Sequence, residues 1–274
     1  MQPWCGGICR GKGRPRHAVN LGERDEQCPN TREERPPRAS TLIQWGQGIE
    51  MPLTLRIGAE ASGTALLVAT VIGSGIMAES LTTDVGMRLL LNQIATILGL
   101  GVLILVLMPI SGAHINPVVT LASVIRRKMP ATQGLSYGVA QVVGATAGTA
   151  LAAIMFDRDL VEISRNDRLT AGTFVAEVVA TAGLIAVILL LVHRGHETAI
   201  PLAVPAWIGA GYVFTSSTSF ANPAVTIGRI FTDSFTGISP LSGLGFIGAQ
   251  IVGMFVALVL VIPVITRKRE KKNG

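Results

Sequence analysis

The chain has 274 residues, of which 49% are apolar and only 15% are charged, and its formal net charge is +6. About 25% of the residues in a soluble domain are usually charged, so this composition excludes an ordinary soluble protein and favours one that is solvated by lipid. The positive charge does not indicate a nucleic-acid-binding protein, because the basic residues are dispersed in short clusters between apolar segments.

Residues 1–50 have the composition of a disordered basic and polar tail, and they lack the apolar core of a secretory signal peptide. All three cysteines lie in this tail. Cys5, Cys9 and Cys28 with His17 do not have the spacing of a known zinc site, so we expect no metal and no other cofactor. An alternative is that Met51 is the natural start and that the tail reflects a misplaced start codon.

Long segments without Asp, Glu, Lys or Arg follow the tail. A membrane-spanning helix needs about 20 apolar residues, because about 30 Å of hydrocarbon is crossed at about 1.5 Å per residue. The sequence therefore predicts an all-α membrane protein with six transmembrane helices. We expect these helices near residues 53–78, 87–108, 131–156, 171–192, 199–214 and 240–265.

Two of the charge-free stretches, 89–125 and 198–228, are too long for one span, and each contains an Asn-Pro pair. An Asn cap followed by Pro is a typical helix start, since the cap oxygen accepts an orphan N–H and Pro has none to lose. Each stretch therefore predicts a full span, a turn and a short re-entrant helix that ends at mid-membrane depth. The two pairs are Asn116-Pro117 and Asn222-Pro223.

Three features recur in the same order at similar offsets and indicate an internal repeat. These are Ala59-Glu60 and Ala176-Glu177, Asn116-Pro117 and Asn222-Pro223, and Ala140-Gln141 and Ala249-Gln250. Each copy has three spans, so the second copy must be inverted relative to the first. We expect a tail at 1–50, a first repeat at 51–158, a second repeat at 159–266 and a basic cytoplasmic tail at 267–274.

Basic residues follow alternate spans, which the positive-inside rule interprets as a cytoplasmic location. The rule places both termini and the Arg126–Lys128 loop on the cytoplasmic side of the plasma membrane, in a bacterium the inner membrane.

The chain resembles the aquaporin (major intrinsic protein) family over residues 55–265. The resemblance is carried by the repeated pairs above and by two segments, Ser111-Gly112-Ala113-His114-Ile115-Asn116-Pro117-Val118-Val119-Thr120 and Ser219-Phe220-Ala221-Asn222-Pro223-Ala224-Val225-Thr226. It implies six helices plus two re-entrant half-helices in the lipid bilayer, a homotetramer and one pore in each subunit. Val118 stands where the family usually has Ala, with a small expected effect.

The resemblance also implies a selectivity filter at four positions, which by spacing are Thr96, Ala210 (or Gly209), Ser219 and Val225. Val225 replaces the usual arginine, which resembles an aquaporin subgroup associated with bacterial arsenic handling, and Thr96 replaces the usual aromatic residue. Small, uncharged residues at all four positions predict a wide opening. We therefore expect a passive channel for small neutral solutes, namely metalloid hydroxides such as arsenite, glycerol and urea, together with water.

Four further residues are candidates for a role in the pore. Glu60 and Glu177 are the only carboxylates within the predicted spans, and we favour a structural role, supporting the two loops, over a proton relay. His114 is expected to pack within its loop. Arg229 lies one helical turn after Val225, where it is either a vestibule charge or a solvated surface arginine.

Three alternatives remain. The first is an orthodox water channel, and the second is a secondary transporter, which would need an intramembrane ion site. The third is a membrane enzyme, for which the membrane region offers no nucleophile and base pair; the sequence therefore predicts a protein that is not an enzyme. Gly144, Gly148 and Gly253 indicate close helix packing.

Overall fold

The computed structural model describes the backbone of residues 51–273 and the side chains of residues 51–266. The predictions for the tail at 1–50, including the cysteine cluster, lie outside these residues. Most of the described chain is helical, and the longest connection between helices runs over residues 156–170. Its elements are α1 (Leu53–Leu81), α2 (Val85–Ser111), α3 (Pro117–Ile125), α4 (Ala131–Met155), α5 (Ala171–Arg194), the 3₁₀ turn η2 (Glu197–Ala199), α6 (Ile200–Phe214), α7 (Pro223–Ile230) and α8 (Pro240–Asn273).

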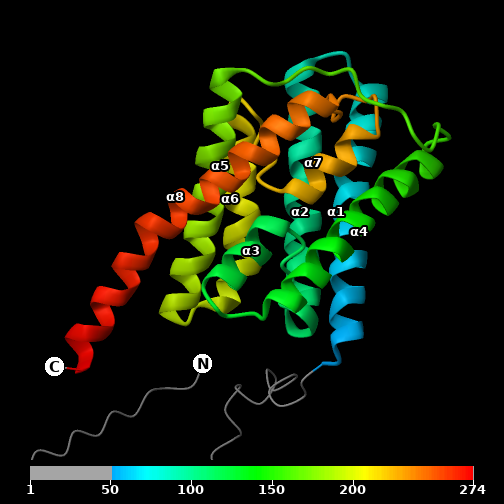
Figure 1. Ribbon diagram of the computed structural model, residues 1–274. Coiled ribbons are helices and arrows are strands. Elements are labelled where there is room, and N and C mark those ends of the chain that lie inside the picture. The colour runs from blue at the N-terminus through cyan, green and yellow to red at the C-terminus, as the bar shows by residue number, and fades with distance from the viewer. Residues whose placement is uncertain (1–50, 274) are drawn as a thin grey trace, which may run out of the picture. The chain divides into compact units, whose positions relative to one another are not determined.

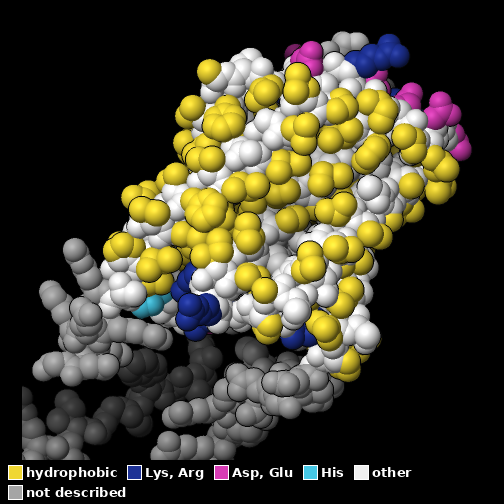
Figure 2. Space-filling view, in the orientation of Figure 1, with side chains coloured by type: hydrophobic (Ala, Val, Ile, Leu, Met, Phe, Trp, Pro, Cys, Tyr) yellow, Lys and Arg dark blue, Asp and Glu magenta, His cyan; other side chains and the backbone are white. Residues whose placement is uncertain are grey.

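Five of these helices, α1, α2, α4, α5 and α8, are long and apolar enough to cross a membrane. The sixth expected span, α6, has 15 residues, so its length is about 22 Å. Large apolar side chains are exposed on the outside, for example Leu98 and Leu105 of α2 and Val259 of α8. Figure 2 shows hydrophobic side chains across the middle of one face and acidic side chains gathered at its upper end. The predicted all-α membrane fold is confirmed.

The helices pack in a scheme that occurs twice. Helix α1 packs against α2 and α4, as α5 packs against α6 and α8, and the short helices α3 and α7 pack against α4 and α8 (Figure 1). Close approach in the α1–α4 pair depends on Gly144 and Gly148, where a Cβ would collide with the carbonyl oxygens of Ala61 and Ala65. This scheme agrees with an internal repeat; the division at residues 158 and 159 stays a prediction.

The short helices α3 and α7 contact each other at the centre of the bundle, with α3 in the lower half and α7 in the upper half of Figure 1. Each begins at the Pro of an Asn-Pro pair, and the preceding Asn caps it in extended backbone conformation. The residues before the caps are strained, because Ile115 and Ala221 both have positive φ angles, of 39° and 47°. Such backbone persists only where the surrounding structure holds it in place.

Candidate pore and selectivity filter

Asn116 and Asn222 bring the two half-helices together. The Oδ1 atom of Asn116 accepts from the backbone N–H of Val118 at 3.0 Å, and that of Asn222 accepts from Ala224 at 3.0 Å. Each side-chain amide also donates to the other loop: Asn116 Nδ2 to the carbonyl of Ala221 and Asn222 Nδ2 to the carbonyl of Ile115, both at 2.8 Å. An amide has two N–H donors, so one of each pair is left for the cavity that both residues line.

Pro117 and Pro223 begin α3 and α7. The residues after them, Val118 and Ala224, are buried in the hydrophobic core and do not line the cavity. The replacement of Ala by Val at position 118 is therefore accommodated by core packing.

Glu60 holds the loop before α3. Its Oε1 accepts from Ser111 Oγ at 2.6 Å and from the backbone N–H of His114 at 2.9 Å. Its Oε2 accepts from the backbone N–H of Ile115 at 2.6 Å and from Gln141 Nε2 at 2.8 Å. Four donors thus surround a carboxylate that is completely buried.

Glu177 holds the loop before α7 in the same way. Its oxygens accept from Ser217 Oγ at 2.7 Å, from the backbone N–H groups of Phe220 and Ala221 at 2.8 and 2.9 Å, and from Gln250 Nε2 at 2.7 Å. Hydrogen bonds to a carboxylate stabilise its ionised form and offset the loss of water. The same arrangement therefore fixes the strained residue before each Asn cap.

His114 packs within its loop. Its Nδ1 lies 3.1 Å from Thr120 Oγ1, and its ring meets that of Tyr137 edge to face, with centroids 5.6 Å apart. Tyr137 in turn donates to the carbonyl of Ser111 at 2.9 Å. His114 also contributes to the cavity wall.

A cavity of about 300 Å³ passes the two Asn residues. The half-helices meet at their N-termini, so residues near their C-termini mark the opposite ends of the cavity. Arg126 and Lys128, after α3, line one end, and Arg229, in the last turn of α7, lines the other. Apolar side chains form most of the wall between them. Among these are Leu67, Val71, Leu100, Ile104, Leu184 and Ile188.

Three of the four predicted filter residues, Thr96, Ser219 and Val225, line this cavity. The fourth prediction is wrong: Ala210 is exposed on the outside of α6, and Gly209 packs against Ile97.

The cavity face of α6 is formed instead by Val204, Ile208 and Tyr212, which are spaced by four residues and therefore share one side of the helix. Tyr212 donates to Thr96 Oγ1 at 3.2 Å. The predicted filter of small residues only is thus wrong as well, because a buried aromatic ring stands in the wall. Nearly every residue of α6 is apolar, so the spacing of four does not by itself distinguish this face from the exposed face with Leu202 and Ala210.

Arg229 is buried, with 4% of its surface exposed, and it lines the cavity beside Val225. The alternative of a solvated surface arginine is therefore wrong. Among the described residues, no group of three or more His, Cys, Asp or Glu side chains is placed to hold a metal ion.

A bundle with two re-entrant half-helices capped around a central cavity is the architecture of a membrane channel. The family model of the major intrinsic proteins matches residues 50–221. The chain is 47% identical over 211 residues to the aquaglyceroporin AqpS of Rhizobium meliloti (strain 1021), covering 77% of this chain and 90% of that protein. It is 30% identical over 190 residues to a probable TIP-type aquaporin of Medicago truncatula, covering 65% of this chain and 75% of that protein.

Among solved structures, the aquaglyceroporin from Plasmodium falciparum has a similar fold, with a TM-score of 0.63 and 24% identity over 78% of this chain and 99% of that chain. The chain belongs to the major intrinsic protein family. At this level its function is that of a multi-pass membrane channel.

Proposed function

We propose that the protein is a passive channel for small uncharged solutes: metalloid hydroxides such as arsenous acid, glycerol and urea, together with water. The observation that carries this proposal is the cavity itself, which runs past Asn116 and Asn222 and meets Val225 where the family usually has arginine. The aquaglyceroporin name of the relative from Rhizobium meliloti supports glycerol as one of the solutes.

The chemistry at the centre suits neutral solutes. The positive ends of the α3 and α7 dipoles converge on the cavity, and each Asn side chain offers one free N–H there. Cations are repelled by these dipoles, while a hydroxyl or carbonyl oxygen accepts from the two amides. Apolar walls on either side provide few other polar groups, so a solute binds weakly and moves on.

Several features favour a channel over the other classes. The carboxylates of Glu60 and Glu177 each accept from four donors, which favours loop support over a proton relay or a transported-ion site. The three basic residues of the Arg126–Lys128 loop agree with an orientation that puts both termini in the cytoplasm of a bacterial cell. A homotetramer and a function without enzymatic chemistry complete the proposal.

Tyr212 and Arg229 favour one alternative, an orthodox water channel. Both line the cavity near Val225, and both reduce the opening that four small residues would leave. The width of the cavity beside Val225 therefore decides between a channel for larger neutral solutes and an orthodox water channel.

Light scattering from proteoliposomes tests the proposal, with water, glycerol, urea and arsenous acid compared in parallel against protein-free vesicles. Flux of all four down their gradients supports it. Flux of water alone supports the water channel, and accumulation of a solute driven by an ion gradient supports a transporter. Val225→Arg adds bulk at the filter, so it is expected to lower glycerol and arsenous acid flux more than water flux. Unchanged glycerol and arsenous acid flux in this variant would contradict the assignment of Val225.

A further inference from the structure

Arg229 has its guanidinium at the level of the filter although its backbone lies one turn further along α7. Helical side chains lean toward the helix N-terminus, so the long side chain of Arg229 returns toward Val225. It lines the cavity together with Thr96, Tyr212 and Val225. A cation therefore stands beside the position from which the family's usual arginine is missing.

The guanidinium is held from one side only. Its Nε donates to the backbone carbonyl of Thr236, and its Cζ lies 3.4 Å from the ring centroid of Phe220. Among the described residues, the two terminal nitrogens of the guanidinium have no hydrogen-bond partner. The surrounding protein does not bury them completely. They consequently offer free N–H donors to the cavity.

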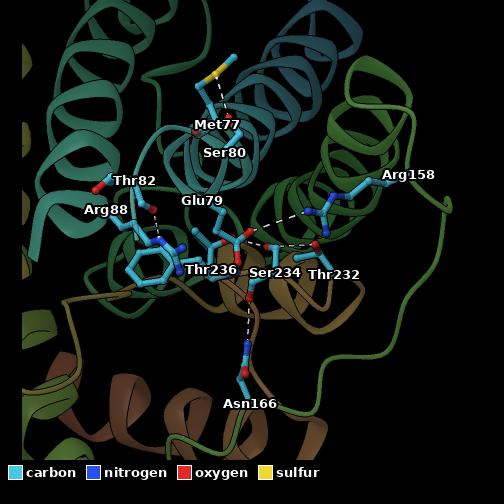
Figure 3. Close-up of polar contacts among 11 residues, drawn as sticks. Met77, Glu79, Ser80, Thr82, Arg88, Arg158, Asn166, Thr232, Ser234 and Thr236 are labelled. Carbon is cyan, nitrogen blue, oxygen red and sulfur yellow. Dashed lines mark hydrogen bonds and ion pairs between the residues drawn. The ribbon is translucent and has the colours of Figure 1, made fainter. Parts of the chain in front are cut away.

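The carbonyl that orients Arg229 belongs to a loop tied at several points. Glu79 Oε1 accepts from the backbone N–H of Phe235 at 3.0 Å, and Asn166 Nδ2 donates to the carbonyl of Ser234 at 2.8 Å. Figure 3 shows these side chains converging on the loop beside Thr236. The guanidinium is thus positioned by a rigid support, as a filter group needs to be.

We propose that Arg229 supplies the fixed positive charge of the filter from one helical turn away, and that its free N–H groups bind hydroxyl oxygens of passing solutes beside Tyr212. This inference rests on the proposed channel function. Its consequence is that cations are rejected at the filter although position 225 is apolar. The width of the filter and its charge are then set by different residues.

The expected size of the effect follows from Coulomb's law. A unit charge about 10 Å away, at an effective dielectric constant of about 20, lowers the local population of a monovalent cation about tenfold. Arg229→Gln removes the charge and keeps a polar side chain of moderate length. We expect this variant to raise K⁺ and H⁺ leak into proteoliposomes about tenfold, with water flux retained.

Arg168→Gln is the matched control. Arg168 lies 6.0 Å from the ring of the same Phe220 and donates to the carbonyl of Phe235, yet it does not line the cavity. This variant loosens the same loop but keeps the Arg229 charge in the cavity, so its cation leak is expected to stay well below that of Arg229→Gln. An equal leak through Arg168→Gln would overturn the proposal, because loop disorder would then explain both results.

One further variant keeps the test decisive if Arg229→Gln does not fold, and a double variant extends the test if it does. Val225→Asp leaves the contacts of Arg229 intact and neutralises its charge, so cation leak is expected to rise here too. Combining Val225→Arg with Arg229→Gln restores a cation at the filter and is expected to abolish the leak. Cation exclusion that survives Val225→Asp, or a leak that persists in the double variant, would overturn the proposal. Neutral-solute flux through the unaltered protein tests the channel function separately.

Discussion

Tyr212 of α6 donates a hydrogen bond to Thr96 of α2 at 3.2 Å, and both side chains line the cavity. Gln93 reinforces the same pair of helices, because its Nε2 donates to the carbonyl of Gly209 at 2.7 Å. The distance between α2 and α6 at this level is therefore set by side-chain hydrogen bonds as well as by packing. The aromatic ring of Tyr212 is a bulky group on the cavity wall at this level, and a single substitution removes it.

Tyr212→Ala is expected to enlarge the filter and to raise glycerol flux severalfold more than water flux, because water already passes the narrower opening. Ala210→Val is the control, since Ala210 is exposed on the outside of the same helix. It is expected to leave both fluxes unchanged. Shrink–swell kinetics in proteoliposomes measure the two variants. The opposite result, with flux sensitive to Ala210 and insensitive to Tyr212, would return the filter position to Ala210.

Asn116→Asp keeps the side-chain oxygen that accepts from the backbone N–H of Val118. It replaces the NH₂ group that donates to the carbonyl of Ala221 with a second oxygen, so this carbonyl loses its donor. An unsatisfied buried group costs about 1–3 kcal/mol, so the unfolding temperature is expected to fall and neutral-solute flux with it. Asn92→Asp is the matched control, because Asn92 is also buried and donates to a backbone carbonyl, that of Val71, but does not line the cavity. Its expected result is some loss of stability with flux retained. Full flux through Asn116→Asp would exclude a pore role for this amide.

Glu60→Gln replaces an accepting oxygen with an NH₂ group that faces donors of the loop before α3. We expect a loss of about 1–3 kcal/mol or more in the free energy of unfolding, because at least one buried donor loses its acceptor. A proton relay would instead give a stable variant in which only the pH dependence of transport is altered. Thermal unfolding in detergent and flux at several pH values distinguish the two results. Glu177→Gln is expected to behave like Glu60→Gln, since its contacts are equivalent.

Gly144→Ala places a methyl group against the carbonyl oxygen of Ala61 and is expected to force α1 and α4 apart, lowering stability by about 1–3 kcal/mol. Gly138 lies in the same helix, and nothing lies within 4 Å of a Cβ built there. Gly138→Ala is therefore expected to be neutral or to stabilise the helix by up to about 1 kcal/mol. Unfolding curves of the two variants, compared with the unaltered protein, check the difference. Equal behaviour would contradict the packing role of Gly144.

Much of the fold follows from patterns in the sequence that depend on local physical chemistry. Charge-free length determines where the spans lie, and the capping preference of Asn with Pro determines where the half-helices begin. The repeated Glu residues identify the groups that hold the loops, because a buried carboxylate needs donors and strained backbone supplies N–H groups. These features can be predicted because each depends on a few neighbouring residues.

The filter was predicted less well, because it depends on how a helix is rotated about its own axis. The assignment of Ala210 by spacing assumes that this helix has the same register as in the family. The structure instead puts Tyr212 on the cavity face, in line with Val204 and Ile208. The position of the Arg229 side chain likewise depends on the carbonyl of Thr236, a backbone group that no side-chain motif identifies.

The exchange of hydrogen bonds between Asn116 and Asn222 has a consequence for biosynthesis. The acceptor of the Asn116 amide is the carbonyl of Ala221, which lies 105 residues further along the chain. This contact of the earlier re-entrant segment therefore cannot form before the later segment has been synthesised. The central pair of hydrogen bonds therefore forms only once both halves of the polypeptide are present.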